Sequence, residues 1–274
     1  MGSSSGRRVA FRPVATRRWR ACALAAVACW AVAACTGAAA SPTTSGPLIR
    51  ILFLGNSYTY VNDLPGTFTQ LAASGGHNVQ TGMVANGGET LSQHAAAADS
   101  LTALTGSNWS YVVLQEQSEI PASASAREQI MYPAARTLSA RIRGAGAVPI
   151  FFMTWAHKDG DPSYGLPDYR SMQIQIDEAY LEIAHEQKDP VAPVGYTWFI
   201  VHQEHAEIQM WVDDGSHPTQ AGTYLAACVF YATVFQQSPE GLSFRGGISS
   251  RDALVLQSAA AREVLQSPAE WGLR

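Results

Sequence analysis

Short runs of consecutive apolar residues alternate along the chain with longer segments of helical periodicity. The apolar runs predict strands at 49–54, 109–114, 148–153 and 191–194, and the mixed stretch 78–84 is a further strand candidate. The longer segments predict helices at 64–74, from 91 into the following alanines, and at 122–143, 168–188, 198–207, 219–236 and 250–265. Strands that alternate with helices predict one α/β domain, with three layers (α/β/α) around a five-stranded parallel sheet.

The first 34 residues have the pattern of an export signal. Six arginines, the last of them Arg20, precede an apolar stretch over 21–34. That stretch is shorter than the roughly 20 residues that a permanent membrane-spanning helix needs. We therefore expect residues 1–34 to be a signal peptide and the protein to be exported.

The end of this segment also resembles a bacterial lipobox, with Cys35 as the residue that would be lipidated. The alternative is ordinary cleavage after the small residues 38–40. The following stretch, 35–47, is rich in Thr, Ala, Ser, Gly and Pro and is expected to be a flexible tether. The folded domain is expected to occupy 48–274.

Removing the leader changes the charge of the protein. The full chain has 18 basic and 22 acidic residues, and loss of the six arginines would leave 12 basic and 22 acidic residues, a net charge of −10. An acidic body argues against binding nucleic acid or anionic lipid surfaces, so membrane contact is expected only through the lipid anchor. Only Cys35 and Cys228 would remain, so no disulfide framework is expected.

Polar residues with catalytic potential stand at two strand-to-helix junctions far apart in sequence. Ser57 follows the first predicted strand, and Asp214 and His217 precede the predicted helix 219–236. Acyl transfer needs a nucleophile, a base and a group that orients the base, and these three residues can fill those roles. The motif Gly-x-Ser-x-Gly is absent around Ser57, so the sharp nucleophile turn of α/β-hydrolases is not indicated.

Three motifs together resemble the SGNH (GDSL-type) hydrolase superfamily. They are Gly-Asn-Ser-Tyr-Thr at 55–59, Gly-Gly-Glu-Thr at 87–90 and Asp-x-x-His-Pro at 214–218. The resemblance covers about 48–237. It implies a flavodoxin-like sheet and an esterase without a metal or other cofactor. It also implies Ser57 as the nucleophile, His217 as the base, Asp214 as its partner, and the N–H groups of Ser57 and Gly88 in the oxyanion hole.

The third motif of the family is altered here. Members usually carry Gly-x-Asn-Asp after the third strand, whereas this chain has Leu-Gln-Glu-Gln-Ser at 114–118. A glutamine carboxamide is the same hydrogen-bond donor on a longer stem. Gln115 and Gln117 are two residues apart and would face the same side of an extended segment, so either could complete the oxyanion hole.

Further side chains follow the fourth predicted strand. Trp155 and His157 would lie at the same sheet edge as Ser57 and are expected to line the substrate pocket. His202 and His205 have a spacing that could support zinc on a helix, but no third ligand is evident. No metal site is therefore predicted.

These features predict an exported serine esterase that acts on a small-molecule or carbohydrate ester, with an acetyl or short acyl group. Two alternatives remain open at this point: a surface lipoprotein that binds glycans without turnover, and a transacylase that shares the acyl-enzyme. The sequence does not specify the alcohol part of the substrate.

Overall fold

A computed structural model describes residues 46–273, so the predicted signal peptide, Cys35 and most of the predicted tether lie outside the described residues. Its centre is a five-stranded parallel sheet with the strand order β2-β1-β3-β4-β5. The strands are β1 (Ile49–Gly55), β2 (Val79–Ala85), β3 (Tyr111–Leu114), β4 (Val148–Phe152) and β5 (Val191–Ala192). Within 46–273, no helix is long and apolar enough to cross a membrane.

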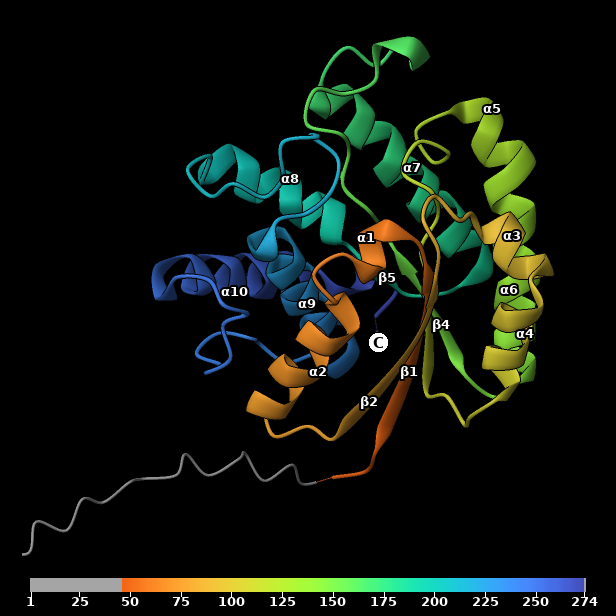
Figure 1. The fold of residues 1–274 in the computed structure, drawn as a ribbon, viewed down its shortest axis with the longest axis horizontal. Coiled ribbons are helices and arrows are strands. Elements are labelled where there is room, and N and C mark those ends of the chain that lie inside the picture. Colours follow the sequence, from red (N-terminus) through yellow and green to blue (C-terminus); the bar gives the residue numbers. More distant parts are fainter. Residues whose placement is uncertain (1–45, 274) are drawn as a thin grey trace, which may run out of the picture. The chain divides into compact units, whose positions relative to one another are not determined.

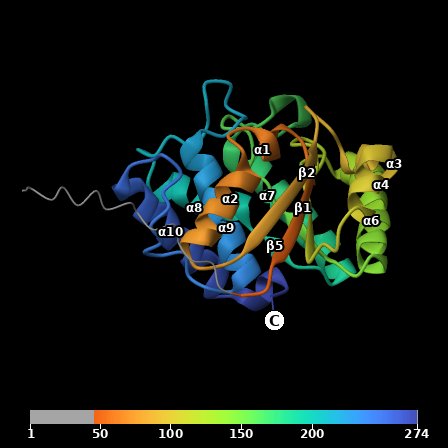
Figure 2. The same ribbon diagram turned by 60° about the horizontal axis from the view of Figure 1, so that its bottom comes forward.

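Helices cover both faces of the sheet (Figures 1 and 2). One layer holds α2 (Leu64–Ser74), α8 (Val194–Glu204), α9 (Gln220–Phe235) and α10 (Ser250–Leu265). The other holds α3 (Leu91–Ala96), α4 (Ala98–Thr105), α6 (Tyr132–Gly144) and α7 (Tyr169–Gln187). The single-turn helix α1 (Ser57–Tyr60) follows β1 directly, and α5 (Ala124–Ala126) precedes α6. This arrangement confirms the predicted three-layer α/β/α fold.

Burial on both faces explains why the buried parts of the central strands β1, β3 and β4 contain no polar residues. Ile51–Leu54 of β1, Val112–Leu114 of β3 and Ile150–Phe152 of β4 are all at most 1% exposed. Helix α9 is buried around nearly its whole circumference, because it packs against α2, α8 and α10 as well as the sheet. Burial of these apolar surfaces is the main source of stability, since the described residues hold the single free cysteine Cys228 and no disulfide.

Several elements differ from the sequence prediction: α8 begins four residues before the predicted helix 198–207, and α4 was not predicted as a separate helix. Two further differences have identifiable reasons. The predicted strand 191–194 is only two residues long, because Pro193 has no N–H to continue the ladder and α8 begins at Val194. The predicted helix 122–143 contains a π-helical turn, η1 (Arg127–Met131), before α6. Pro133 at the second position of α6 lacks the N–H that would continue a regular helical ladder across this junction.

Candidate active site

Ser57 is the first residue of α1, at the carboxyl end of β1. Asn56 caps this turn: its side-chain oxygen accepts a hydrogen bond from Tyr58 N–H (3.1 Å), and its amide group donates to the Glu89 carbonyl (3.0 Å). The preceding residue must be glycine, because a Cβ on Gly55 would lie 2.4 Å from Thr59 Oγ1. The turn from strand to helix therefore holds Ser57 at the sheet edge with its side chain half-buried.

Asp214 and His217 lie on a short loop that is closed by a bridge between Trp211 and Pro218. One carboxylate oxygen of Asp214 accepts the backbone N–H groups of Ser216 and His217, each at 2.8 Å. The other oxygen lies 2.7 Å from His217 Nδ1. Partial burial would raise the pKa of Asp214, but the two backbone hydrogen bonds and the imidazole outweigh it and lower the pKa.

The loop brings His217 to Ser57 across 160 residues of sequence. His217 Nε2 lies 2.9 Å from Ser57 Oγ. Because the Asp214 carboxylate accepts only from a protonated Nδ1, the neutral imidazole presents an unprotonated Nε2 to the serine hydroxyl. Nucleophile, base and acid predicted from the sequence therefore form one continuous hydrogen-bonded chain.

A stack of aromatic rings packs against the hydrogen-bonded group formed by Ser57, His217 and Asp214. Trp155 lies between Tyr58 (ring centroids 4.4 Å apart) and Trp198 (4.2 Å), and the Tyr58 ring meets the His217 imidazole edge-on. Trp155 Nε1 donates to the Ser216 carbonyl (2.8 Å) in the Asp214–His217 loop. Trp155 is 0% exposed. This corrects the expectation that it lines the substrate pocket: it is buried between Tyr58 and Trp198 and anchors the loop.

A cavity of about 320 Å³ opens in front of Ser57 and His217. Its walls are small, polar or aromatic groups from four segments of the chain: Asn56, Tyr58, Tyr60, Gly87, Gly88, Gln117, Ser118 and Ser216. Among the described residues, no acceptor takes the backbone N–H of Ser57 or of Gly88. These two donors are thus available to an oxygen atom bound in the cavity.

The structure separates the two glutamines that the sequence left as alternatives. Gln115 is fully buried beneath the turn, where its carboxamide oxygen accepts from Asn56 N–H (2.8 Å) and Thr59 Oγ1 (2.9 Å). Its amide group donates to the Glu116 carbonyl (2.5 Å). Gln117 lines the cavity instead, and its amide group makes only a long contact of 3.4 Å with Ser118 Oγ. Of the two, Gln117 has the free donor.

Glu116 lies between these glutamines and is completely buried. One carboxylate oxygen accepts from Leu91 N–H (3.1 Å) and Gln117 N–H (2.7 Å). The other has no hydrogen-bond partner among the described residues. Burial raises the pKa of Glu116 to about 7, against the lowering effect of the two backbone hydrogen bonds.

This carboxyl makes stability depend on pH in a defined direction. Between about pH 4.5 and 7 the folded protein retains a proton that the unfolded chain has released, so this contribution to stability falls as the pH rises. We expect Glu116→Gln to unfold like the wild type near pH 4 and to be more stable by about 3 kcal/mol at pH 8. Urea denaturation at both pH values measures the difference. An equal difference at both values would contradict the assignment to Glu116. Asp177, whose pKa burial also raises to about 7, is common to both proteins.

Sequence reasoning missed a buried histidine under the Ser57 turn. His94 of α3 is 0% exposed; its Nε2 lies 2.9 Å from the Gly55 carbonyl and its Nδ1 lies 2.8 Å from Ser100 Oγ. It therefore ties α3 to the end of β1. A lone histidine in an alanine-rich segment gives no sequence signal of this role.

The other histidines have distinct environments. His157 lies beside Ser118 (Nε2 to Oγ, 3.3 Å), next to the cavity but outside its wall. His202 packs edge-on against Tyr169 and Trp211, and burial lowers its pKa. His205 lies 3.4 Å from Glu207. His202 and His205 thus have separate partners.

No family model and no curated protein matches this sequence, whereas solved structures do. A protein from Slackia heliotrinireducens described as an SGNH hydrolase has a TM-score of 0.59 and 28% identity, over 69% of this chain and 100% of its own. A DUF4886 family protein from Bacteroides uniformis has a TM-score of 0.70 and 19% identity, over 80% and 95%. An acetyl xylan esterase has a TM-score of 0.53 and 12% identity, over 68% and 100%. The last two show the fold alone.

The shared fold and the group at its sheet edge place this protein in the class of α/β/α hydrolases. The chain belongs to the SGNH hydrolase superfamily, as the motifs at 55–59, 87–90 and 214–218 predicted.

Proposed function

We propose that this protein is a serine esterase that hydrolyses short acyl esters through an acyl-enzyme. The proposal depends above all on one observation, the continuous chain from Ser57 Oγ through His217 (2.9 Å) to the Asp214 carboxylate (2.7 Å). A hydroxyl aligned with an oriented, unprotonated imidazole nitrogen is the arrangement that nucleophilic catalysis by serine requires.

The reaction follows from this geometry. Ser57 Oγ attacks the ester carbonyl while its proton moves to His217 Nε2, and Asp214 stabilises the imidazolium that forms. The tetrahedral intermediate collapses when His217 returns the proton to the departing alcohol, which leaves an acyl group on Ser57. Water, deprotonated by the same nitrogen, then attacks the acyl group and releases the acid, restoring the serine hydroxyl.

The negative oxygen of the intermediate needs donors, and we assign them to Ser57 N–H, Gly88 N–H and the Gln117 amide. The two backbone groups have no other acceptor among the described residues, and Gln117 lines the same cavity. Of the two alternatives, this assignment excludes Gln115, whose carboxamide is already hydrogen-bonded within the core.

Alanine substitutions distinguish the two glutamines. We expect Gln117→Ala to lower kcat about a hundredfold with little change in the free energy of unfolding, because it removes a donor to the oxyanion. We expect Gln115→Ala to lower the free energy of unfolding by about 2 kcal/mol or more, because it leaves buried polar groups unpaired. Steady-state kinetics and urea denaturation of both variants provide the test. A loss of kcat confined to stable Gln115→Ala would reverse the assignment.

The proposed substrate is an acetyl or short acyl ester, with a carbohydrate as the alcohol. The cavity of about 320 Å³ is small for a long acyl chain, and glycine, serine and amide groups make up much of its wall. Tyr60, 41% exposed at its rim, offers a ring face on which a sugar could stack. The fold is also used by an acetyl xylan esterase.

Activity profiling tests this function. p-Nitrophenyl esters of increasing chain length are compared with acetylated sugars, using the full chain and Ser57→Ala. We expect kcat/KM to be highest for acetate and to fall with longer chains. Equal activity in the two proteins would refute the esterase, while saccharide binding without turnover would favour a glycan-binding protein. Transfer of the acyl group to an added sugar in place of water would identify a transacylase.

Export and lipidation at Cys35 remain part of the proposal, on the basis of the leader 1–34 and the lipobox-like residues that end at Cys35. Metabolic labelling with a fatty acid in a bacterial host tests it: label should enter the wild type and be absent from Cys35→Ser. A secreted, unlabelled wild type would instead indicate cleavage after 38–40.

A further inference from the structure

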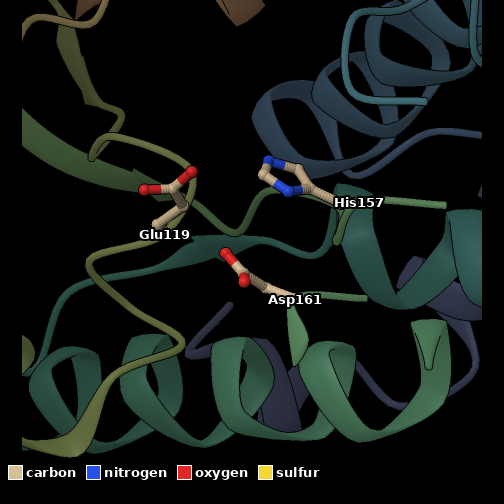
Figure 3. A group of neighbouring side chains, drawn as sticks. All are labelled: Glu119, His157 and Asp161. Atoms are coloured by element: carbon tan, nitrogen blue, oxygen red, sulfur yellow. The ribbon is translucent and has the colours of Figure 1, made fainter. Parts of the chain in front are cut away.

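Three potential metal ligands come together beside the cavity, from two loops that are far apart in sequence. Glu119 follows β3, whereas His157 and Asp161 lie between β4 and α7. One ligand atom of each lies within 4.8 Å of the corresponding atoms of the other two, and all three residues are half-buried (Figure 3). An imidazole with two carboxylates differs from an ordinary acidic patch, because it combines nitrogen and oxygen donors.

Neither of the two carboxylates has an ion-pair partner among the described residues. Within 46–273, no lysine or arginine forms an ion pair with Glu119 or Asp161. The Glu119 carboxylate has no hydrogen-bond donor in the same range. One oxygen of Asp161 accepts from Ser163 N–H and its hydroxyl, and the other oxygen is free. Two like charges at close range in a half-buried place repel each other, and a cation between them would remove this repulsion.

We propose that Glu119, His157 and Asp161 bind a divalent transition-metal ion, for which Zn²⁺ is the best-fitting probe. Imidazole nitrogen favours zinc and its neighbours over calcium or magnesium, and three protein ligands leave a position for water. Ligand atoms about 2.1 Å from a zinc ion lie roughly 3.4 Å apart in tetrahedral geometry. The present separations, all within 4.8 Å, exceed this by at most about 1.4 Å, a difference that small side-chain rotations can close.

The position of the site gives the ion a structural role. Glu119 N–H donates to the Gln117 side-chain oxygen (2.9 Å), so the Glu119 turn orients the proposed oxyanion donor. On the other side, the segment that carries His157 holds the Asp214–His217 loop, through Trp155 Nε1 to the Ser216 carbonyl (2.8 Å) and Lys158 N–H to the Gly215 carbonyl (2.7 Å). The ion would cross-link the two sides of the cavity. This effect on turnover rests on the proposed function, whereas metal binding does not.

Titration of the chelator-treated full chain with ZnCl₂ tests the site. Calorimetry should show one tight equivalent in the wild type. Affinity should fall at least about tenfold, the lower limit for losing even an outer-sphere partner, in His157→Ala and in Glu119→Gln. His205→Ala is the matched control, because His205 is also half-buried and has a carboxylate neighbour in Glu207. It should bind zinc like the wild type.

The possible outcomes distinguish zinc binding at the site from the effect of zinc on turnover. Zinc binding that is absent from the wild type, or equally strong in His157→Ala and the wild type, would overturn the proposal. If circular dichroism shows that His157→Ala is unfolded, Glu119→Gln decides, since its side chain holds no hydrogen bond whose loss could unfold the protein. Zinc should also raise kcat of the chelated wild type but not of Glu119→Gln, and binding without this increase would overturn the cross-linking role. An enzyme inactive on all esters refutes the proposed function, while the titration still tests the metal site.

Discussion

Replacing Ser57 with alanine is expected to lower kcat for a short-chain ester by about 10⁵-fold. The reason is that, within 46–273, no other hydroxyl is hydrogen-bonded to His217 Nε2, which lies 2.9 Å from Ser57 Oγ. The free energy of unfolding should change little, because the side chain is half-buried and occupies the edge of a cavity. Single-turnover and steady-state assays measure the loss, and Ser74→Ala, a half-buried serine at the end of α2, serves as the control.

A second feature of this prediction is its lack of additivity. Ser57 and His217 act as one unit, so His217→Ala should cost about as much as Ser57→Ala, and the double variant should be hardly worse than either. If the fold-loss in kcat of the double variant instead equalled the product of the two single losses, the residues would contribute independently. That result would refute the proton transfer from Ser57 to His217.

Replacing Trp155 with alanine is expected to lower the free energy of unfolding by about 3–5 kcal/mol. Its ring is fully buried between Tyr58 and Trp198, and its removal would leave a large cavity in the stack. Urea denaturation measures the change. A loss below about 1 kcal/mol would mean that the ring is not part of the core.

Trp155→Phe distinguishes anchoring of the loop from contact with substrate. Phenylalanine keeps most of the stacking but loses the hydrogen bond from Nε1 to the Ser216 carbonyl, so the Asp214–His217 loop should be held less firmly. We expect kcat to fall severalfold while KM stays nearly constant. A raised KM with an unchanged kcat would instead restore Trp155 to the substrate pocket.

Much of the fold could be predicted from hydrophobic pattern alone, because its central strands are covered on both faces. The continuous apolar runs at 49–54 and 148–153 gave the positions of β1 and β4 to within one residue. The short β5 and the π-helical turn before α6 could not be predicted in this way, since both depend on how a proline fits the local backbone ladder.

The site shows a similar division. The sequence alone could predict the site residues Ser57, Asp214 and His217, because each lies in a short local motif at a junction between secondary-structure elements. Gln115 and Gln117 were not separable, because the argument assumed an extended segment. β3 in fact ends at Leu114, and the Gln117 oxygen then accepts from Glu119 N–H and Ile120 N–H in a turn. The direction of a side chain after a strand depends on such tertiary contacts.

The Trp211–Pro218 bridge affects how the arrangement of nucleophile, base and acid forms during folding and how it is lost on unfolding. Since acid and base occupy one short closed loop, their mutual alignment forms locally, and folding has to solve only a single long-range fit, between that loop and the end of β1. Because this single fit holds the loop beside β1, a local opening of the loop would separate the base from the nucleophile while the sheet stays intact. Loss of activity in mild denaturant should therefore precede global unfolding.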